Sequence, residues 1–113
     1  MANTDAAVVL TTAPNDAEAV ALARILVERQ LAACVQRLPI HSVYHWEGAV
    51  QDEPEILLLI KTRACRYAEV EACIRQHHSY TVPEILMLPV SAGSTSYLAW
   101  LGGLVAPAKD GLK

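Results

Sequence analysis

The stretch EILLLIK, residues 55–61, decides the fold. Five apolar residues follow one another between two charged ones, a length and composition typical of a β-strand. Because successive side chains of a strand point to opposite faces of its sheet, both faces of this strand are apolar. An antiparallel sheet with one face in water would instead alternate apolar and polar residues. We therefore predict a strand that is covered on both sides.

The segments around this strand show the same apolar character or a helical repeat. Residues 6–12 and 84–90 are apolar and partly β-branched, and residues 33–46 are rich in β-branched and aromatic side chains. Pro39 cannot donate to a strand ladder, which predicts a bulge or a sheet edge there. The predicted order is strand 6–12, helix 15–30, strand 33–46, turn 47–53, strand 55–61, helix 62–78, strand 84–90 and helix 94–101.

Capping residues set the expected limits of the helices. Asn15 stands three residues before Glu18, a variant of the capping box, and Thr62 is the predicted cap of the second helix. Gly102-Gly103 is predicted to stop the third helix, which leaves residues 103–113 as a loose tail. The chain is therefore expected to be one domain, residues 1–113, with its core in about 6–102. The order βαββαβ with an added C-terminal helix is the α+β, ferredoxin-like plan.

Composition excludes several classes of protein. The 113 residues are 53% hydrophobic and 19% charged, which is a globular composition. The net charge of −3 disfavours nucleic acid as a partner, because phosphate backbones are bound by basic surfaces. The longest apolar runs are much shorter than a membrane span, so no membrane partner is expected. The three cysteines are odd in number and lack a CxxC spacing, and reduced thiols predict a cytoplasmic protein.

A single copy of this chain cannot cover both faces of the predicted sheet. Leaving about six large apolar side chains in water would forgo about 10 kcal/mol, at roughly 1.5–3 kcal/mol each. That is comparable to the whole stability of a small domain. We infer that other copies of the chain cover the second face, with strand 33–46 and the turn at 47–53 as the arms that reach a neighbour. Cover by the third helix and the tail alone is the alternative.

Seven spaced blocks of the sequence, in this order, resemble the CutA family of divalent-cation tolerance proteins, over about residues 7–101. The blocks are Thr12-Ala13-Pro14, Leu31-Ala32-Ala33-Cys34-Val35, Trp46-Glu47-Gly48, Ile60-Lys61-Thr62, Tyr80-Thr81-Val82-Pro83-Glu84-Ile85, Leu88-Pro89-Val90 and Tyr97-Leu98-Ala99-Trp100-Leu101. The resemblance implies a ferredoxin-like homotrimer with an architecture like that of the P-II signalling proteins. It also implies a cytoplasmic location in bacteria, a link to copper tolerance and the ability to bind Cu(II) or another divalent cation, with none tightly required.

The resemblance points to His77 and His78 as metal ligands. In some members of the family, copper is ascribed to two matching histidines and to a cysteine late in the first strand. This chain has Thr11 at the cysteine position, so the thiolate that favours copper is missing. Both histidines are expected at a fraying helix end, where they can turn towards one ion. The alternative is two solvent-facing histidines that stabilise the helix end.

Six further residues are candidates for a pocket between subunits. Lys61 ends one apolar strand and Glu84 begins another, so the two charges are predicted to pair at buried strand ends. Tyr97 and Trp100 share a helix face because they are three residues apart. The full candidate set is Trp46, Lys61, Tyr80, Glu84, Tyr97 and Trp100. A role in holding the trimer together is the alternative.

The sequence therefore favours a trimeric metal-responsive binding protein. It contains no GxSxG, P-loop, GxGxxG or HExxH motif, and we do not expect an enzyme. The first alternative is a P-II-like sensor that binds a small molecule, an anion or a nucleotide in the subunit clefts. The second is an uncharacterised enzyme that uses Lys61 and Glu84 as polar groups in that cleft.

Overall fold

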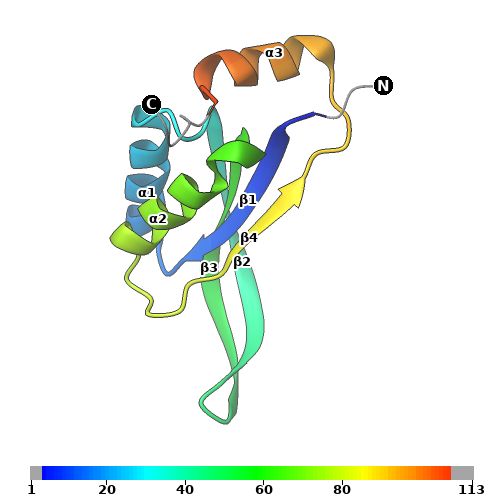
Figure 1. Cartoon of the computed structure of the whole chain (residues 1–113). Coiled ribbons are helices and arrows are strands. Elements are labelled where there is room, and N and C mark those ends of the chain that lie inside the picture. The colour runs from blue at the N-terminus through cyan, green and yellow to red at the C-terminus, as the bar shows by residue number, and fades with distance from the viewer. Residues whose placement is uncertain (1–3, 108–113) are drawn as a thin grey trace.

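The computed structural model describes residues 4–107. Four antiparallel strands form one sheet in the order β2-β3-β1-β4, which confirms the ferredoxin-like α+β prediction (Figure 1). In chain order the elements are β1 (Ala6–Ala13), α1 (Asp16–Glu28), β2 (Cys34–Trp46), β3 (Ala49–Arg63), the 3-10 turn η1 (Ala64–Arg66), α2 (Tyr67–His77), β4 (Ile85–Pro89) and α3 (Thr95–Leu104).

Helices α1 and α2 lie together on one face of the sheet (Figure 1). The predicted cap of α1 forms, because Asn15 accepts a hydrogen bond from the backbone N–H of Glu18 at 2.8 Å. Apolar side chains of the sheet and the helices meet in a hydrophobic core between them. The largest fully buried core side chains are Val9, Leu22, Leu26, Leu58, Ile60, Val70 and Ile74.

The opposite face of the sheet is apolar and lies mostly open. Register places Val9 beside Ile60 on the helix side, and the next pair, Leu10 and Leu59, therefore points away from the helices. We call this surface the open sheet face; its apolar members are Val8, Leu10, Leu38, Leu57, Leu59, Leu86 and Leu88. Leu86 is 55% exposed and Leu88 is 50% exposed. Within residues 4–107, α3 lies only across one end of the sheet (Figure 1).

The hairpin between β2 and β3 is longer than the sequence predicts. The turn holds only Glu47 and Gly48, so the expected turn over residues 47–53 is wrong. Both turn residues have positive φ, 51° and 79°, as a two-residue hairpin turn requires, and the chain pairs again from Ala49 onwards. The paired arm projects beyond the rest of the protein (Figure 1). Pro39 lies on β2, an edge strand, in an unbroken register.

The predicted start of the second helix is also wrong. Thr62 does not cap α2; it lies within β3, where its buried hydroxyl donates to the carbonyl oxygen of Leu31 at 2.6 Å. The strand continues to Arg63 because it still pairs with Ala6 of β1. The α2 helix then begins at Tyr67 and has no side-chain cap.

The end of the third helix differs from the prediction in the same way. Gly102-Gly103 does not stop α3, which runs on to Leu104, and Val105 behind it is fully buried. Buried Leu101 and Val105 anchor this last turn, and that packing outweighs the weak helix propensity of glycine. Arg63 also donates to the carbonyl oxygen of Val105 at 3.2 Å. Residues 103–105 therefore belong to the folded chain and not to a loose tail, and residues 108–113 lie outside the described chain.

No helix within residues 4–107 has both the length and the apolar character needed to cross a membrane.

Candidate functional site

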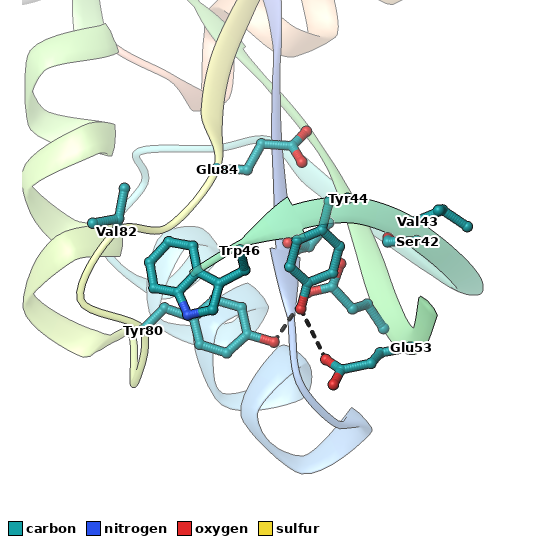
Figure 2. A pocket seen from close by; sticks show the side chains of 10 residues that line it. Ser42, Val43, Tyr44, Trp46, Glu53, Tyr80, Val82 and Glu84 are labelled. Carbon is teal, nitrogen blue, oxygen red and sulfur yellow. Dashed lines mark hydrogen bonds between the residues drawn. The ribbon is translucent and has the colours of Figure 1, made fainter. Parts of the chain in front are cut away.

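A pocket of about 600 Å³ lies where the hairpin arm leaves the body of the sheet (Figure 2). Strands β2 and β3 supply one wall, and the loop before β4 supplies the other. Three of the six predicted pocket residues line it, namely Trp46, Tyr80 and Glu84. The other lining residues are Thr12, Ser42, Val43, Tyr44, Val82, Glu53 and Glu55.

The hairpin register places one set of pocket residues on the same face of the arm. Ser42 lies opposite Glu53, and Tyr44 and Trp46 follow at intervals of two residues, so their side chains share a side of β2. Glu55 belongs to the same side of β3. By register this is also the side of the open sheet face, so the pocket and the uncovered apolar surface adjoin.

Two tyrosines hold two carboxylates in the pocket. The hydroxyl of Tyr44 donates to Glu53 Oε1 at 2.8 Å, and the hydroxyl of Tyr80 donates to Glu55 Oε2 at 3.0 Å. Glu55 is only 8% exposed. Burial and the hydrogen bond to Glu55 raise the pKa of Tyr80 to about 12, and the bond to Glu53 raises the pKa of Tyr44. Both phenols therefore remain donors at neutral pH.

The pocket is acidic and has no compensating positive charge. Its lining contains Glu53, Glu55 and Glu84 but no lysine, arginine or histidine. Within residues 4–107 none of these three carboxylates forms an ion pair. The side chains of Tyr44, Trp46 and Tyr80 form aromatic walls beside them (Figure 2). The arrangement suits a positively charged molecule better than an anion.

The rings of His77 and His78 make different contacts and differ in exposure. His78 has a fully buried side chain whose Nε2–H donates to the carbonyl oxygen of Thr12 at 2.6 Å. Its Nδ1 accepts the backbone N–H of Tyr80 at 3.0 Å, so both ring nitrogens are engaged. Exposed His77 donates from Nδ1 to the carbonyl oxygen of Cys73 at 2.9 Å, which leaves its Nε2 available. No three His, Cys, Asp or Glu side chains of residues 4–107 converge on a metal-sized point.

Lys61 and Glu84 do not pair within the protomer, so that prediction is wrong. Strands β3 and β4 both run antiparallel to β1, which lies between them, and are therefore parallel to each other. The end of β3 and the beginning of β4 consequently lie at opposite ends of the sheet. Lys61 sits beside Val8 on the open sheet face, while Glu84 lines the pocket.

Tyr97 and Trp100 share a face of α3, as the spacing predicts. Their ring centroids are 5.4 Å apart and both side chains are exposed. They lie at the end of the molecule opposite Trp46, which stands at the hairpin turn (Figure 1). These three aromatic residues can wall one pocket only if they come from different copies of the chain.

Sequence reasoning missed seven of the ten lining residues, among them the hydrogen-bonded Tyr44, Glu53 and Glu55. The expected turn over residues 47–53 excludes Glu53 from the strand, and a charged residue at the start of an apolar strand, such as Glu55, gives no local sign of a pocket. The sequence does contain the two-residue alternation of Ser42, Tyr44 and Trp46. This alternation places the three residues on the same face as Glu53 and Glu55 only if the hairpin turn has two residues.

Comparison with known proteins agrees with this fold. Residues 7–103 match the family described as CutA1 divalent ion tolerance protein. The divalent-cation tolerance protein CutA of Pectobacterium atrosepticum is 46% identical over 98 residues, covering 86% of this chain and 89% of the relative. The protein CutA homolog of Xenopus laevis is 44% identical over 95 residues, which are 83% of this chain; the match spans only 63% of that relative's length.

A solved structure shows the same architecture. The periplasmic divalent cation tolerance protein CutA from Archaeoglobus fulgidus has a TM-score of 0.88 and 37% identity, with 89% of this chain and 99% of that chain covered. The resemblance inferred from the seven sequence blocks is thereby confirmed. The chain belongs to the CutA1 divalent ion tolerance protein family.

Proposed function

We propose that this chain is a cytoplasmic, homotrimeric protein that binds copper or another divalent cation and acts in divalent-cation tolerance. Membership of the CutA1 family over residues 7–103 is the observation that carries this proposal. The family is named for tolerance of divalent ions, and an enzymatic activity is not part of the proposal.

The open sheet face supports the assembly of several copies. Leu86 and Leu88 are each about half exposed, and Leu57 and Leu59 on the same face are half-buried. A contiguous apolar surface of this kind is typical of an interface. The projecting β2-β3 arm has unpaired backbone groups on the outer side of β2, an edge that a neighbour can use. The number of copies, three, and the P-II-like architecture are proposed from the family resemblance and not from this surface.

His77 is the first residue proposed as a metal ligand, because its Nε2 is exposed and available. His78 can join only if it gives up the bond to Thr12 or the bond from Tyr80. A copper site at this pair therefore requires either a local rearrangement or ligands from a neighbouring copy.

Copper titration tests the metal site directly. Wild type, His77→Ala and His78→Ala are titrated with Cu(II) under conditions where sedimentation shows the same oligomer. We expect His77→Ala to weaken binding by about tenfold or more. Equal affinity in wild type and His77→Ala would remove His77 from the site, and no binding by wild type would reject the metal function.

The cysteines support a reducing compartment. Cys34, Cys65 and Cys73 are all free thiols, although the Archaeoglobus relative is described as periplasmic. Fractionation of the source cells with an antibody to the chain distinguishes the two locations.

A small-molecule sensor is the second candidate, and the pocket of about 600 Å³ favours it. Its acidic lining weighs against the anion or nucleotide that the P-II analogy suggests. The separation of Lys61 from Glu84 weighs against an enzyme built on those two residues within one protomer.

A further inference from the structure

A thiol and an imidazole face each other near the end of α2. Cys73 and His77 are four residues apart and therefore share a face of the helix. Sγ of Cys73 lies 3.9 Å from Nδ1 of His77. Both residues belong to α2, which lies on the opposite side of the sheet from the open sheet face (Figure 1). The pair is therefore outside the surface that we assign to contacts between copies.

The separation of the two atoms fits one metal ion between them. In zinc sites a thiolate sulfur binds at about 2.3 Å and an imidazole nitrogen at about 2.0 Å, so two such donors of one ion are at most about 4.3 Å apart. The observed 3.9 Å is slightly shorter and gives a bent arrangement. The backbone of α2 therefore does not have to move for Cys73 and His77 to reach the same ion.

The sulfur of Cys73 is sheltered but not strongly bonded. Cys73 is 3% exposed. Within residues 4–107 its Sγ has two weak polar contacts, each at 3.9 Å, with Nδ1 of His77 and with Nη1 of Arg29. The side chains of both neighbours are exposed, so an ion reaches the sulfur by displacing the ring of His77. A thiolate that binds a monovalent cation carries no net charge with it, and Arg29 does not repel such a pair.

The donor set selects the kind of ion. Burial raises the pKa of the Cys73 thiol, so only a cation with a strong preference for sulfur displaces its proton. In the described part of the chain no third His, Cys, Asp or Glu joins the pair, which disfavours the four-ligand sites typical of Zn²⁺. His78 cannot complete the site, because both of its ring nitrogens are already hydrogen-bonded. Cu(I) is a soft ion that thiolates favour, and two ligands satisfy it.

We propose that Cys73 and His77 bind one Cu(I) ion through Sγ and Nδ1. Binding forms a copper–sulfur bond and a copper–nitrogen bond, and the thiol proton leaves to solvent. The imidazole proton moves from Nδ1, where it now bonds the carbonyl oxygen of Cys73, to Nε2. Neither copper nor sulfur changes its oxidation state. This proposal rests on the copper binding proposed above and deepens it, because it assigns a sulfur ligand and the oxidation state of the ion.

Anaerobic titration of the reduced, full-length chain with Cu(I) tests the proposal. The ion is supplied as its acetonitrile complex, and near-ultraviolet absorbance reports the bond between copper and thiolate. We expect the absorbance of wild type to rise and to saturate. The absence of a saturable rise would overturn the proposal.

Matched variants locate the site. Cys73→Ala and His77→Gln are each expected to weaken Cu(I) binding by about tenfold or more, because each removes one of the two bonds. Cys65→Ser removes an exposed free thiol outside the pair and should bind like wild type. His77 is exposed, so His77→Gln keeps the core intact if Cys73→Ala fails to fold. Equal affinity in wild type and Cys73→Ala, or an equal loss in Cys65→Ser and Cys73→Ala, would reject the site.

Cu(II) titration separates this proposal from the proposed function. Cys73→Ala should retain the Cu(II) binding assigned above to Nε2 of His77, while it loses Cu(I) binding. Cu(II) binding without Cu(I) binding in wild type would reject the pair of Cys73 and His77 alone. Binding of neither ion by wild type would reject both this pair and the copper function.

Discussion

The Nε2–H of His78 donates to the carbonyl oxygen of Thr12 at 2.6 Å, and this bond joins the end of α2 to the end of β1. The backbone N–H of Tyr80 donates back to Nδ1 of the same ring at 3.0 Å. In this arrangement Nε2 is the donor and Nδ1 the acceptor of the ring. His78 thereby positions the loop that presents Tyr80 to the pocket.

Replacing the two histidines should have very different effects on stability. His78→Ala removes two hydrogen bonds and a fully buried ring, and we expect a loss of about 2–4 kcal/mol. His77→Ala removes an exposed ring and should cost less than about 1 kcal/mol. Denaturant unfolding at equal chain concentration measures both. Similar losses in the two variants would contradict the structural role of His78.

A charge on the open sheet face should disrupt assembly. Leu86 is 55% exposed in one protomer, and Leu86→Glu would place an unpaired carboxylate against a neighbouring copy. We expect the oligomer to dissociate to smaller species in sedimentation experiments at micromolar concentration. Val27→Glu is the matched control, because Val27 is 41% exposed on α1, away from this face. A wild type that sediments as a folded monomer would refute the proposed interface.

Two buried threonines should respond in opposite directions to the same change. The hydroxyl of Thr11 is buried without a hydrogen-bond partner in residues 4–107, so Thr11→Val should be neutral or stabilise by about 1 kcal/mol. The hydroxyl of Thr62 donates to the carbonyl oxygen of Leu31, so Thr62→Val should cost about 1–3 kcal/mol. Denaturant titrations of the two variants and the wild type measure these changes in the free energy of unfolding. A large loss in Thr11→Val would show that its hydroxyl has a role that the contacts do not reveal.

Alkaline titration should detect the environment of Tyr80. Burial and the bond to Glu55 raise its pKa to about 12, above the value of about 10 for a tyrosine in an unfolded chain. The folded state therefore retains a proton that the unfolded state loses, and stability should fall as the pH rises from about 10 to about 12. Below about pH 10 this contribution is fully present.

Absorbance of tyrosinate and unfolding measurements check this prediction together. Tyr80→Phe should show a smaller loss of stability over that pH range, and Glu55→Gln should move the pKa of Tyr80 back towards its ordinary value. Tyr97→Phe, which changes a residue outside the pocket, serves as the control. An unchanged pH profile in Tyr80→Phe would mean that its phenol is not held by Glu55.

The sequence by itself determined the order of the elements, the family and the apolar character of both faces of the sheet. These features follow from local sequence patterns, namely the apolar run at residues 55–61, the helical repeat of α1 and the seven spaced blocks. The cap at Asn15 could be predicted because it depends on a neighbour three residues away. Predictions at Thr62 and at Gly102-Gly103 failed because strand pairing and buried packing overrode local propensity.

Only the tertiary structure decided which polar residues meet. A strand between β3 and β4 makes those two parallel, which separates Lys61 from Glu84 and brings Glu84 to the same pocket as Glu55. A turn of two residues sets the hairpin register and thereby places Tyr44 beside Glu53. The hydrogen bond to Thr12 on β1 holds His78 inward, whereas His77 is exposed. Such contacts join residues far apart in the chain, and no local pattern encodes them, because they depend on strand order and register.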